Sequence, residues 1–221
     1  MPLTPAEIAD RIKQMRQAEG DKLYRLSYAN KTILTAATLR ELLTLRFADL
    51  AEGAILLAEA GHIVPGLTLA RAALETMALL CRIDQLAIRY LNDSGEEKPF
   101  TEFVEKTLFA GKLEEWEGSA PTNIVTIVQH IGKSVPAIAR LYNVLSEYAH
   151  PNYHGLMGSY SKPDPVEDAV LIGRDQRDRP IEHVLAALAV CIPMLEASYN
   201  SLAQSLSTLN SQIKDAKPKA P

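Results

Sequence analysis

The fold is decided by residues 67–91, which read LTLARAALETMALLCRIDQLAIRYL. Most of these residues are good helix formers, and the stretch is apolar almost all round, as in a helix that neighbouring elements cover on most sides. The preceding stretch, Asp21 to Ala60, repeats apolar residues at three- and four-residue steps, which predicts another long helix with one apolar face. Two such helices need helical partners, so we expect an all-α helical bundle.

Caps and prolines mark further helices on both sides of this pair. Thr4 and Pro5 are typical of a helix start, and this first helix should end near Glu19. Other helices are expected at residues 101–110, 122–131, 136–150 and 181–214. No domain boundary is evident, so we expect a single helical domain over residues 1–214 and a disordered tail at residues 215–221.

Residues 151–180 interrupt the helical pattern, because prolines and glycines recur through them. The one strand-like run is Ala169 to Ile172, and residues 155–160 could pair with it as a small hairpin. A connection of this length in a compact domain is usually functional or disordered. We therefore expect a long irregular loop after residue 150.

Composition limits the classes of function. The chain carries 27 acidic and 23 basic residues, a net charge of −4, which argues against broad binding of nucleic acid or anionic membranes. The N-terminus lacks the pattern of a signal peptide, and the longest apolar run, Val184 to Leu195, is shorter than the roughly 20 residues of a membrane span. We expect a cytoplasmic protein with no membrane segment, in which Cys81 and Cys191 are core thiols.

Two charged residues on the central helix form a candidate site. Arg71 and Glu75 are four residues apart and therefore share a helix face. One interpretation is a solvated stripe that continues through Arg82 and Gln85 to Arg89. The other is an internal ion pair that faces a polar site and needs further partners, because unpaired buried charge is costly.

A second candidate site lies at the end of the helix over residues 136–150. Tyr142, Ser146 and His150 recur at four-residue steps beside the apolar face, and they could form a hydrogen-bond chain. The row either ties the helix end to the loop or lets His150 act as an acid, base or ligand near neutral pH. Asn152 and His154 in the loop are further candidate binding residues. Pro151 interrupts the His150–His154 spacing, so we expect neither a metal site nor a cofactor.

Two segments together resemble a known family. LARAALET at Leu69–Thr76 and YNVLSEYAHP at Tyr142–Pro151 resemble a bacterial all-helical family of unknown function, in which an Arg-x-x-x-Glu helix precedes a helix that ends in Ser-x-x-x-His. That family is similar to the HEPN group of helical-bundle proteins. The resemblance covers about residues 40–200 and implies a HEPN-like bundle. Many HEPN proteins are metal-independent ribonucleases of toxin or antiviral systems.

The nuclease motif of that group places an arginine four to six residues before a histidine on one helix end. His150 matches the histidine, but Leu145 and Ser146 stand where the arginine belongs, and Arg140 is too far upstream. Two functions stay open. The favoured one is a module that binds a small ligand or a protein partner through Arg71, Glu75, Tyr142, Ser146 and His150. The alternative is a ribonuclease with His150 as general acid or base and Arg71 stabilising the transition state; RNA is expected as a partner only then.

The final helix suggests self-association. Its apolar face runs from Leu185 to Leu206, about 30 Å at 1.5 Å per residue, which is long for one small bundle to cover. Exposed apolar stripes mark interfaces, so a homodimer through this helix is one expectation. The other expectation is that the Asp21–Ala60 helix covers the same face within one chain.

Overall fold

The structure is a computed structural model of the whole chain, and it describes residues 3–19, 25–28, 30–109, 122–173 and 180–216. These residues form eight α-helices, one turn of 3-10 helix (η1) and a two-stranded hairpin. Their bounds are α1 Pro5–Glu19, α2 Lys31–Glu59, α3 Ile63–Asn92, η1 Ser94–Glu96, α4 Glu97–Phe109, α5 Ile124–Ser134, α6 Pro136–Ala149, α7 Met157–Tyr160, β1 Ser161–Pro163, β2 Val170–Ile172 and α8 Pro180–Ala216.

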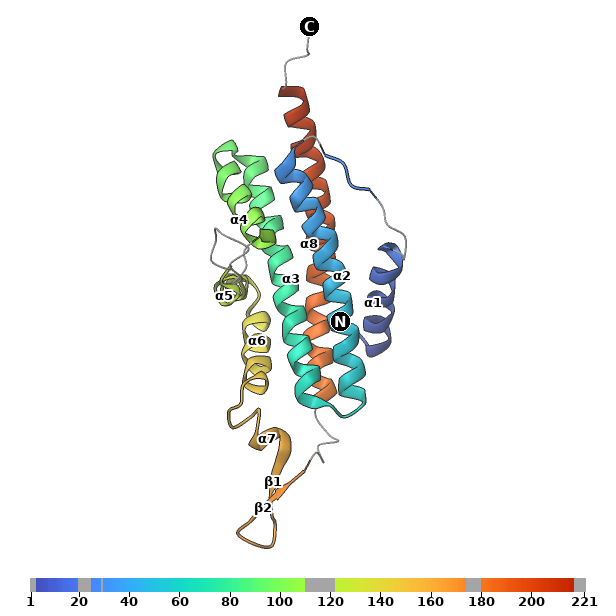
Figure 1. Cartoon of the computed structure of the whole chain (residues 1–221), viewed down its shortest axis with the longest axis vertical. Coiled ribbons are helices and arrows are strands. Elements are labelled where there is room, and N and C mark those ends of the chain that lie inside the picture. The colour runs from blue at the N-terminus through green and yellow to red at the C-terminus, as the bar shows by residue number, and fades with distance from the viewer. Residues whose placement is uncertain (1–2, 20–24, 29, 110–121, 174–179, 217–221) are drawn as a thin grey trace.

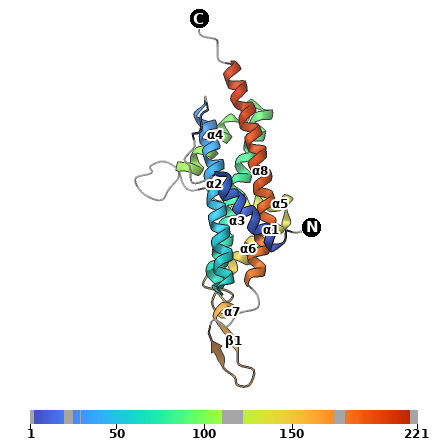
Figure 2. The ribbon, with the colours of Figure 1, turned by 90° about the vertical axis from the view of Figure 1, so that its right-hand side faces the viewer.

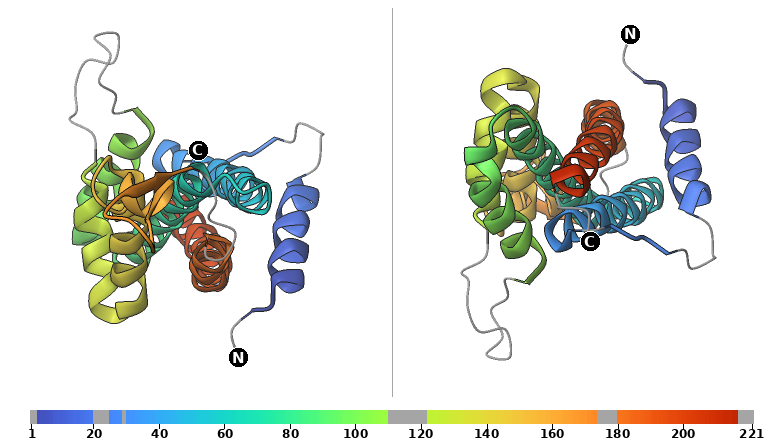
Figure 3. Two further views of the ribbon diagram at one scale, coloured as in Figure 1. Left: turned by 90° about the horizontal axis from the view of Figure 1, so that it is seen from below. Right: turned by 90° about the horizontal axis from the view of Figure 1, so that it is seen from above.

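The three longest helices, α2, α3 and α8, lie side by side along the molecule, and α3 contacts both of the others (Figures 1 and 2). The first helix, α1, packs on the outer side of α2 and α8. Helices α4, α5 and α6 cover the opposite side of α3 (Figure 3). The expected all-α bundle is therefore confirmed, with the apolar stretch of residues 67–91 at its centre.

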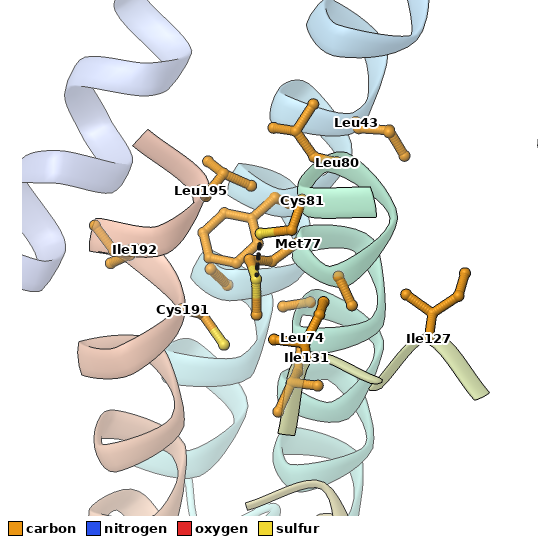
Figure 4. Close-up of a cluster of buried hydrophobic side chains, with 14 of the residues drawn as sticks. Leu43, Leu74, Met77, Leu80, Cys81, Ile127, Ile131, Cys191, Ile192 and Leu195 are labelled. Carbon is orange, nitrogen blue, oxygen red and sulfur yellow. Dashed lines mark hydrogen bonds between the residues drawn. The ribbon is translucent and has the colours of Figure 1, made fainter. Parts of the chain in front are cut away.

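Small residues let α2 and α3 approach closely. Ala51, Ala54, Ala70 and Ala73 are fully buried. A Cβ on Gly66 would lie 3.0 Å from the carbonyl oxygen of Ala54, so only glycine fits there without displacing the α2 backbone. Larger side chains fill the space between α3 and α8, where Met77 and Cys81 of α3 face Cys191 of α8 (Figure 4). This packing fixes the position of α3, which carries Arg71 and Glu75.

Several helix ends differ from the sequence-based expectation. Residues 25–28 are not helical, and α2 begins only after Asn30, whose side chain accepts a hydrogen bond from the backbone N–H of Ile33. Helix α4 begins at Glu97, four residues before the expected start, since Pro99 fits the first turn of a helix. The expected end of the first helix near Glu19 is confirmed. The expected tail at residues 215–221 lies largely outside the described residues.

The hairpin after residue 150 exists, but its first strand is not where we expected it. Residues 157–160 form the short helical turn α7, and the strand follows at Ser161–Pro163. It pairs antiparallel with β2, with Lys162 opposite Leu171. A hydrogen bond from the amide of Tyr160 to the carbonyl of Leu156 closes the turn that replaces the expected strand.

The apolar face of the last helix is covered within the chain. Leu188, Ile192, Leu195, Leu202 and Leu206 are all fully buried, against α2 and α3. The homodimer expected through this face therefore loses the exposed apolar surface that suggested it, and it stays a prediction.

Two of the described helices are long and apolar enough to cross a membrane by length and composition. They are Ile63–Asn92, with a mean hydropathy of 1.4 in its best window, and Ile181–Asp215, with 1.5. This differs from the expectation of no membrane segment, which was based on the short apolar run from Val184 to Leu195. Core helices pass the same test, and 56% of the window in α3 is buried inside the bundle, so this is weak support for a membrane segment.

Candidate functional site

Three predicted site residues meet between α3 and α6. Arg71 donates a hydrogen bond from Nη2 to the hydroxyl of Tyr142 at 2.9 Å. That hydroxyl in turn donates to Oε1 of Glu75 at 3.2 Å, and Nε of Arg71 lies 3.2 Å from the same carboxylate oxygen. The Arg71 guanidinium also lies 5.1 Å from the centre of the Tyr142 ring. Arg71, Glu75 and Tyr142 therefore form one closed polar cluster that joins two helices.

The cluster is partly buried, which is intermediate between a solvated stripe and a fully internal Arg71–Glu75 ion pair. The side chains of Arg71 and Glu75 are 24% and 27% exposed, whereas Tyr142 is 6% exposed. The solvated stripe is interrupted one turn later, because Ala78 is fully buried. Nε of Arg71 is buried and makes no well-directed hydrogen bond, although it lies close to the carboxylate. Arg71 thus balances the charge of Glu75 mainly through its proximity. The well-directed hydrogen bond to the Glu75 carboxylate comes from the Tyr142 hydroxyl.

A pocket of about 230 Å³ opens beside Glu75. Four elements enclose it: α2, α3, α4 and the start of α5. Its lining residues are Arg46, Ala72, Glu75, Thr76, Leu79, Lys106, Thr107, Thr122 and Ile124. The pocket therefore shares Glu75 with the cluster, and it places two cationic side chains and three hydroxyl groups around one small volume.

The two cations of the pocket have no ion-pair partner among the described residues. Lys106 is half-buried on α4 and Arg46 is exposed on α2. Glu75, the carboxylate among the described lining residues, is already paired with Arg71. The unneutralised charge at the pocket is therefore positive, which favours anions.

The hydroxyl groups differ in how they are satisfied. Thr76 and Thr107 donate to carbonyl oxygens of their own helices, each at 2.8 Å. Oγ1 of Thr122, just before α5, is buried and has no hydrogen-bond partner in the described part of the chain. Buried hydroxyls are nearly always paired in folded proteins, so Thr122 is the polar atom of this pocket that most needs a partner.

Sequence reasoning missed the cationic side of this pocket. Arg46 and Lys106 belong to ordinary amphipathic helices, where surface cations are common. No spacing rule links them to Glu75, since they come from different elements. A partial signal was the Arg71–Glu75 pair itself, which required a polar neighbour.

The structure does not bring His150 or Ser146 into the cluster. His150 is exposed at the end of α6, about 12 Å along the helix axis from Tyr142 at 1.5 Å per residue. Among the described residues, no hydrogen bond, ion pair or ring contact joins it to Arg71. Oγ of Ser146 is buried but likewise has no hydrogen-bond partner there. The expected chain from Tyr142 through Ser146 to His150 is therefore not formed.

The remaining two candidates shape the loop. Asn152 donates to a carboxylate oxygen of Glu147 at 2.7 Å and accepts from the amide of Gly155 at 3.0 Å, so it holds the turn after α6. The ring of His154 lies 6.0 Å from that of Tyr148 and 5.7 Å from that of Tyr153. These contacts are typical of loop packing. The described residues contain no group of three or more His, Cys, Asp or Glu side chains placed to hold a metal ion.

Comparison with known proteins gives no relative. No protein-family model matches the chain, and neither the curated proteins nor the solved structures include a significant match.

Proposed function

We propose that this protein is a binding module for a small anionic ligand, and that the ligand occupies the pocket beside Glu75. The observation that carries the proposal is the pairing pattern of its charges. Within the described part of the chain, Arg46 and Lys106 line the pocket without an ion-pair partner, while the one carboxylate of the lining, Glu75, is paired with Arg71. A carboxylate or phosphate group would complete this arrangement.

Five of the lining residues have a direct physical role in this proposal. Arg46 offers a planar guanidinium that suits a carboxylate or phosphate, and Lys106 supplies a second, compact positive charge from α4. Thr122 gives a hydroxyl that can donate to the ligand and satisfy its own buried oxygen. Leu79 and Ile124 provide apolar walls. Small-molecule sites commonly combine such walls with a few convergent polar groups.

The Arg71–Glu75–Tyr142 cluster positions and neutralises the inner wall. Without Arg71, the carboxylate of Glu75 would repel an anion in the same pocket. Tyr142 holds both side chains through its hydroxyl. Arg71 and Tyr142, which do not line the pocket, are therefore expected to affect ligand affinity through Glu75.

The test is a titration of the purified protein with sodium phosphate and sodium acetate at constant ionic strength, followed by calorimetry and by amide chemical shifts. We expect saturable binding of at least one anion, with shifts concentrated around Lys106 and Thr122. Lys106→Gln and Arg46→Gln should each weaken affinity about tenfold, the effect of roughly 1.4 kcal/mol. Arg89→Gln, which removes an exposed cation of α3 outside the pocket lining, is the matched control. Absence of saturable binding, or an equal loss in the control, would overturn the proposal.

The ribonuclease alternative receives less support, because His150 is exposed and Tyr142 is the residue that meets Arg71. It stays a prediction with its own assay. Wild-type protein incubated with single-stranded RNA and a chelator should leave the RNA intact if the binding module is correct. Cleavage that is lost in His150→Ala, with the fold preserved, would favour the nuclease instead.

A further inference from the structure

The hairpin projects beyond one end of the bundle, away from the three central helices (Figures 1 and 2). Large apolar side chains are exposed on it and on the turns that lead into it. They are Tyr153, Leu156, Met157, Tyr160, Val166, Val170, Leu171 and Ile172, and Val166 and Ile172 reach 87% and 86% exposure. Apolar groups gathered in this way usually mark an interaction surface.

The two edges of the hairpin are not equivalent. The amide of Asp164 donates to the carbonyl of Ala169, and the amide of Gly173 donates to the carbonyl of Tyr160. These bonds fix which backbone groups of β2 point toward β1. In an antiparallel ladder these positions alternate, so the N–H and C=O groups of Val170 and Ile172 point outward from β2. No described residue pairs with the β2 edge, which is therefore an open template for another strand.

The outer edge of β1 is blocked. Its outward positions are Ser161 and Pro163, since these are the residues opposite Ile172 and Val170. The amide of Ser161, which caps the end of α7, already donates to the carbonyl of Met157, the first residue of that helix, and Pro163 has no N–H. No backbone donor of β1 is left for a further strand, and proline on an edge is a common protection against pairing.

The open edge is complementary to itself. Placed antiparallel about Leu171, two copies of Val170-Leu171-Ile172 set Val170 of one opposite Ile172 of the other. The outward N–H and C=O groups of both residues are then paired across a two-fold axis. All three residues are apolar, two are β-branched, and none carries a charge that would repel its copy.

Stability also favours an added strand. A two-stranded hairpin without a covered face is marginal in water, and three or more strands are needed for independent stability. All residues of β2 are exposed. Pairing of two β2 edges gives a four-stranded sheet in the order β1–β2–β2–β1, and its outer edges are the blocked ones, so association ends at two copies.

We propose that the β2 edge is a homodimerisation surface, in which β2 of one copy pairs antiparallel with β2 of a second copy. The paired strands are short, so the dimer is weak and reversible. This surface is separate from the pocket beside Glu75, and the proposal does not depend on the proposed function.

The test is sedimentation velocity of the full chain over low to high micromolar concentrations, with two variants at one position. Ile172→Pro keeps an apolar side chain but removes an outward amide, without breaking a bond between β1 and β2. Ile172→Thr keeps the amide and the β-branch but removes apolar surface. We expect a concentration-dependent dimer for the wild type and for Ile172→Thr, and a monomer throughout for Ile172→Pro.

Hydrogen exchange provides the second measurement. The amides of Val170 and Ile172 should become protected as the wild-type concentration rises, whereas the amide of Leu171, which faces β1, should not change. A wild type that is monomeric at every concentration overturns the proposal. A dimer that survives Ile172→Pro also overturns the proposal, because the contact then lies elsewhere. Loss of the dimer in Ile172→Thr overturns it too, because the contact then depends on apolar surface and not on the backbone groups of β2.

Discussion

Nη2 of Arg71 lies 2.9 Å from the hydroxyl oxygen of Tyr142, although the two residues are 71 positions apart in the chain. This contact joins the central helix α3 to α6, and the same hydroxyl passes a hydrogen bond on to Glu75. A charge pair that would otherwise lie on one helix face is thereby fixed by a second helix. The geometry of the pocket wall consequently depends on one phenolic oxygen.

Tyr142→Phe should lower the free energy of unfolding by about 1–2 kcal/mol, because the ring stays in place while a hydrogen bond to a charged group on each side is lost. Urea denaturation followed by circular dichroism measures the change. Tyr160→Phe, at an exposed position outside the cluster, should shift the midpoint little. Equal effects of the two variants would contradict the assigned role of the Tyr142 hydroxyl.

The helical fold was predictable because its signals are local and repeated. The apolar pattern of residues 67–91 identifies a central helix whatever its neighbours are. Pro136 marks a helix start that the structure confirms, and the helix expected from residue 122 begins at Ile124. The first strand of the hairpin was misplaced because residues 157–160 carry no strong preference. Tertiary position, with the α7 turn closing onto Leu156, decides their conformation.

The candidate site was predictable only in part. Arg71, Glu75 and Tyr142 were identified as candidates, since polar residues in apolar helices need partners. Their joining was expected together with Ser146 and His150, but the hydroxyl of Ser146 has no hydrogen-bond partner among the described residues and His150 is exposed at the helix end. Arg46 and Lys106 reach the pocket from separate helices, and only the angles between those helices bring them together.

A second ion pair gives a sharp stability prediction. Arg40 stacks over the ring of Tyr199 at 4.4 Å and donates from Nε to Glu41 at 2.7 Å, while the Tyr199 hydroxyl donates to the other oxygen of Glu41 at 3.0 Å. Burial alone would lower the pKa of Arg40, but hydrogen bonding and charge from Glu41 raise it overall. Glu41→Ala leaves this guanidinium nearly buried without its carboxylate, so we expect a loss of about 3 kcal/mol in unfolding free energy.

Guanidinium denaturation of Glu41→Ala measures that loss. The matched control is Glu102→Ala on α4. The carboxylate of Glu102 lies 3.7 Å from Nζ of Lys98, and the Lys98 side chain is 84% exposed. Exposed pairs of this kind contribute about 0.5 kcal/mol or less, so the control should be close to the wild type. Similar losses in both variants would mean that the Arg40–Glu41 pair is no more important than a surface contact.

The loop after α6 depends on a glycine. A Cβ on Gly155 would lie 1.9 Å from the carbonyl oxygen of His150, a distance that forces the backbone to move. Gly155→Ala should therefore destabilise the protein by about 1–3 kcal/mol, the range for overpacking, and open the loop to limited proteolysis. Gly173→Ala, where an added Cβ meets nothing within 4 Å, should leave the proteolysis pattern unchanged. Resistance of Gly155→Ala to proteolysis would contradict this close contact.

Both cysteines should be unreactive in the folded protein. Burial raises the pKa of the Cys81 thiol to about 11, although the hydroxyl of Ser198 donates to its sulfur at 3.2 Å and opposes part of the shift. Burial raises the pKa of Cys191 as well. A disulfide reagent at mildly alkaline pH should therefore label the thiols of the native chain only as fast as the chain unfolds. In denaturant, both thiols should react immediately. Rapid labelling of the native chain would show that this part of the core opens readily.

The last prediction concerns Asp84, which is 8% exposed on α3 and has one buried carboxylate oxygen without a hydrogen-bond partner among the described residues. Burial raises its pKa above the ordinary value of 3.8, and a hydrogen bond from Ser201 opposes the shift. The native state therefore binds the proton more tightly than the unfolded state. It follows that this group costs nothing at pH values below 3.8, and that its cost grows as the pH rises from there through the native pKa.

Asp84→Asn keeps the shape of the side chain and removes the ionisation. At neutral pH the variant should have the higher melting temperature, because the wild type must keep a buried charge whose cost the hydrogen bond from Ser201 offsets only in part. The difference between the two proteins should shrink as the pH falls toward 3.8, since wild-type Asp84 is then protonated in both states. The other carboxyl groups titrate in both proteins and cancel in this comparison, which calorimetry at a series of pH values supplies. A variant less stable than the wild type at neutral pH would mean instead that the charge of Asp84 is satisfied and that burial does not dominate its titration.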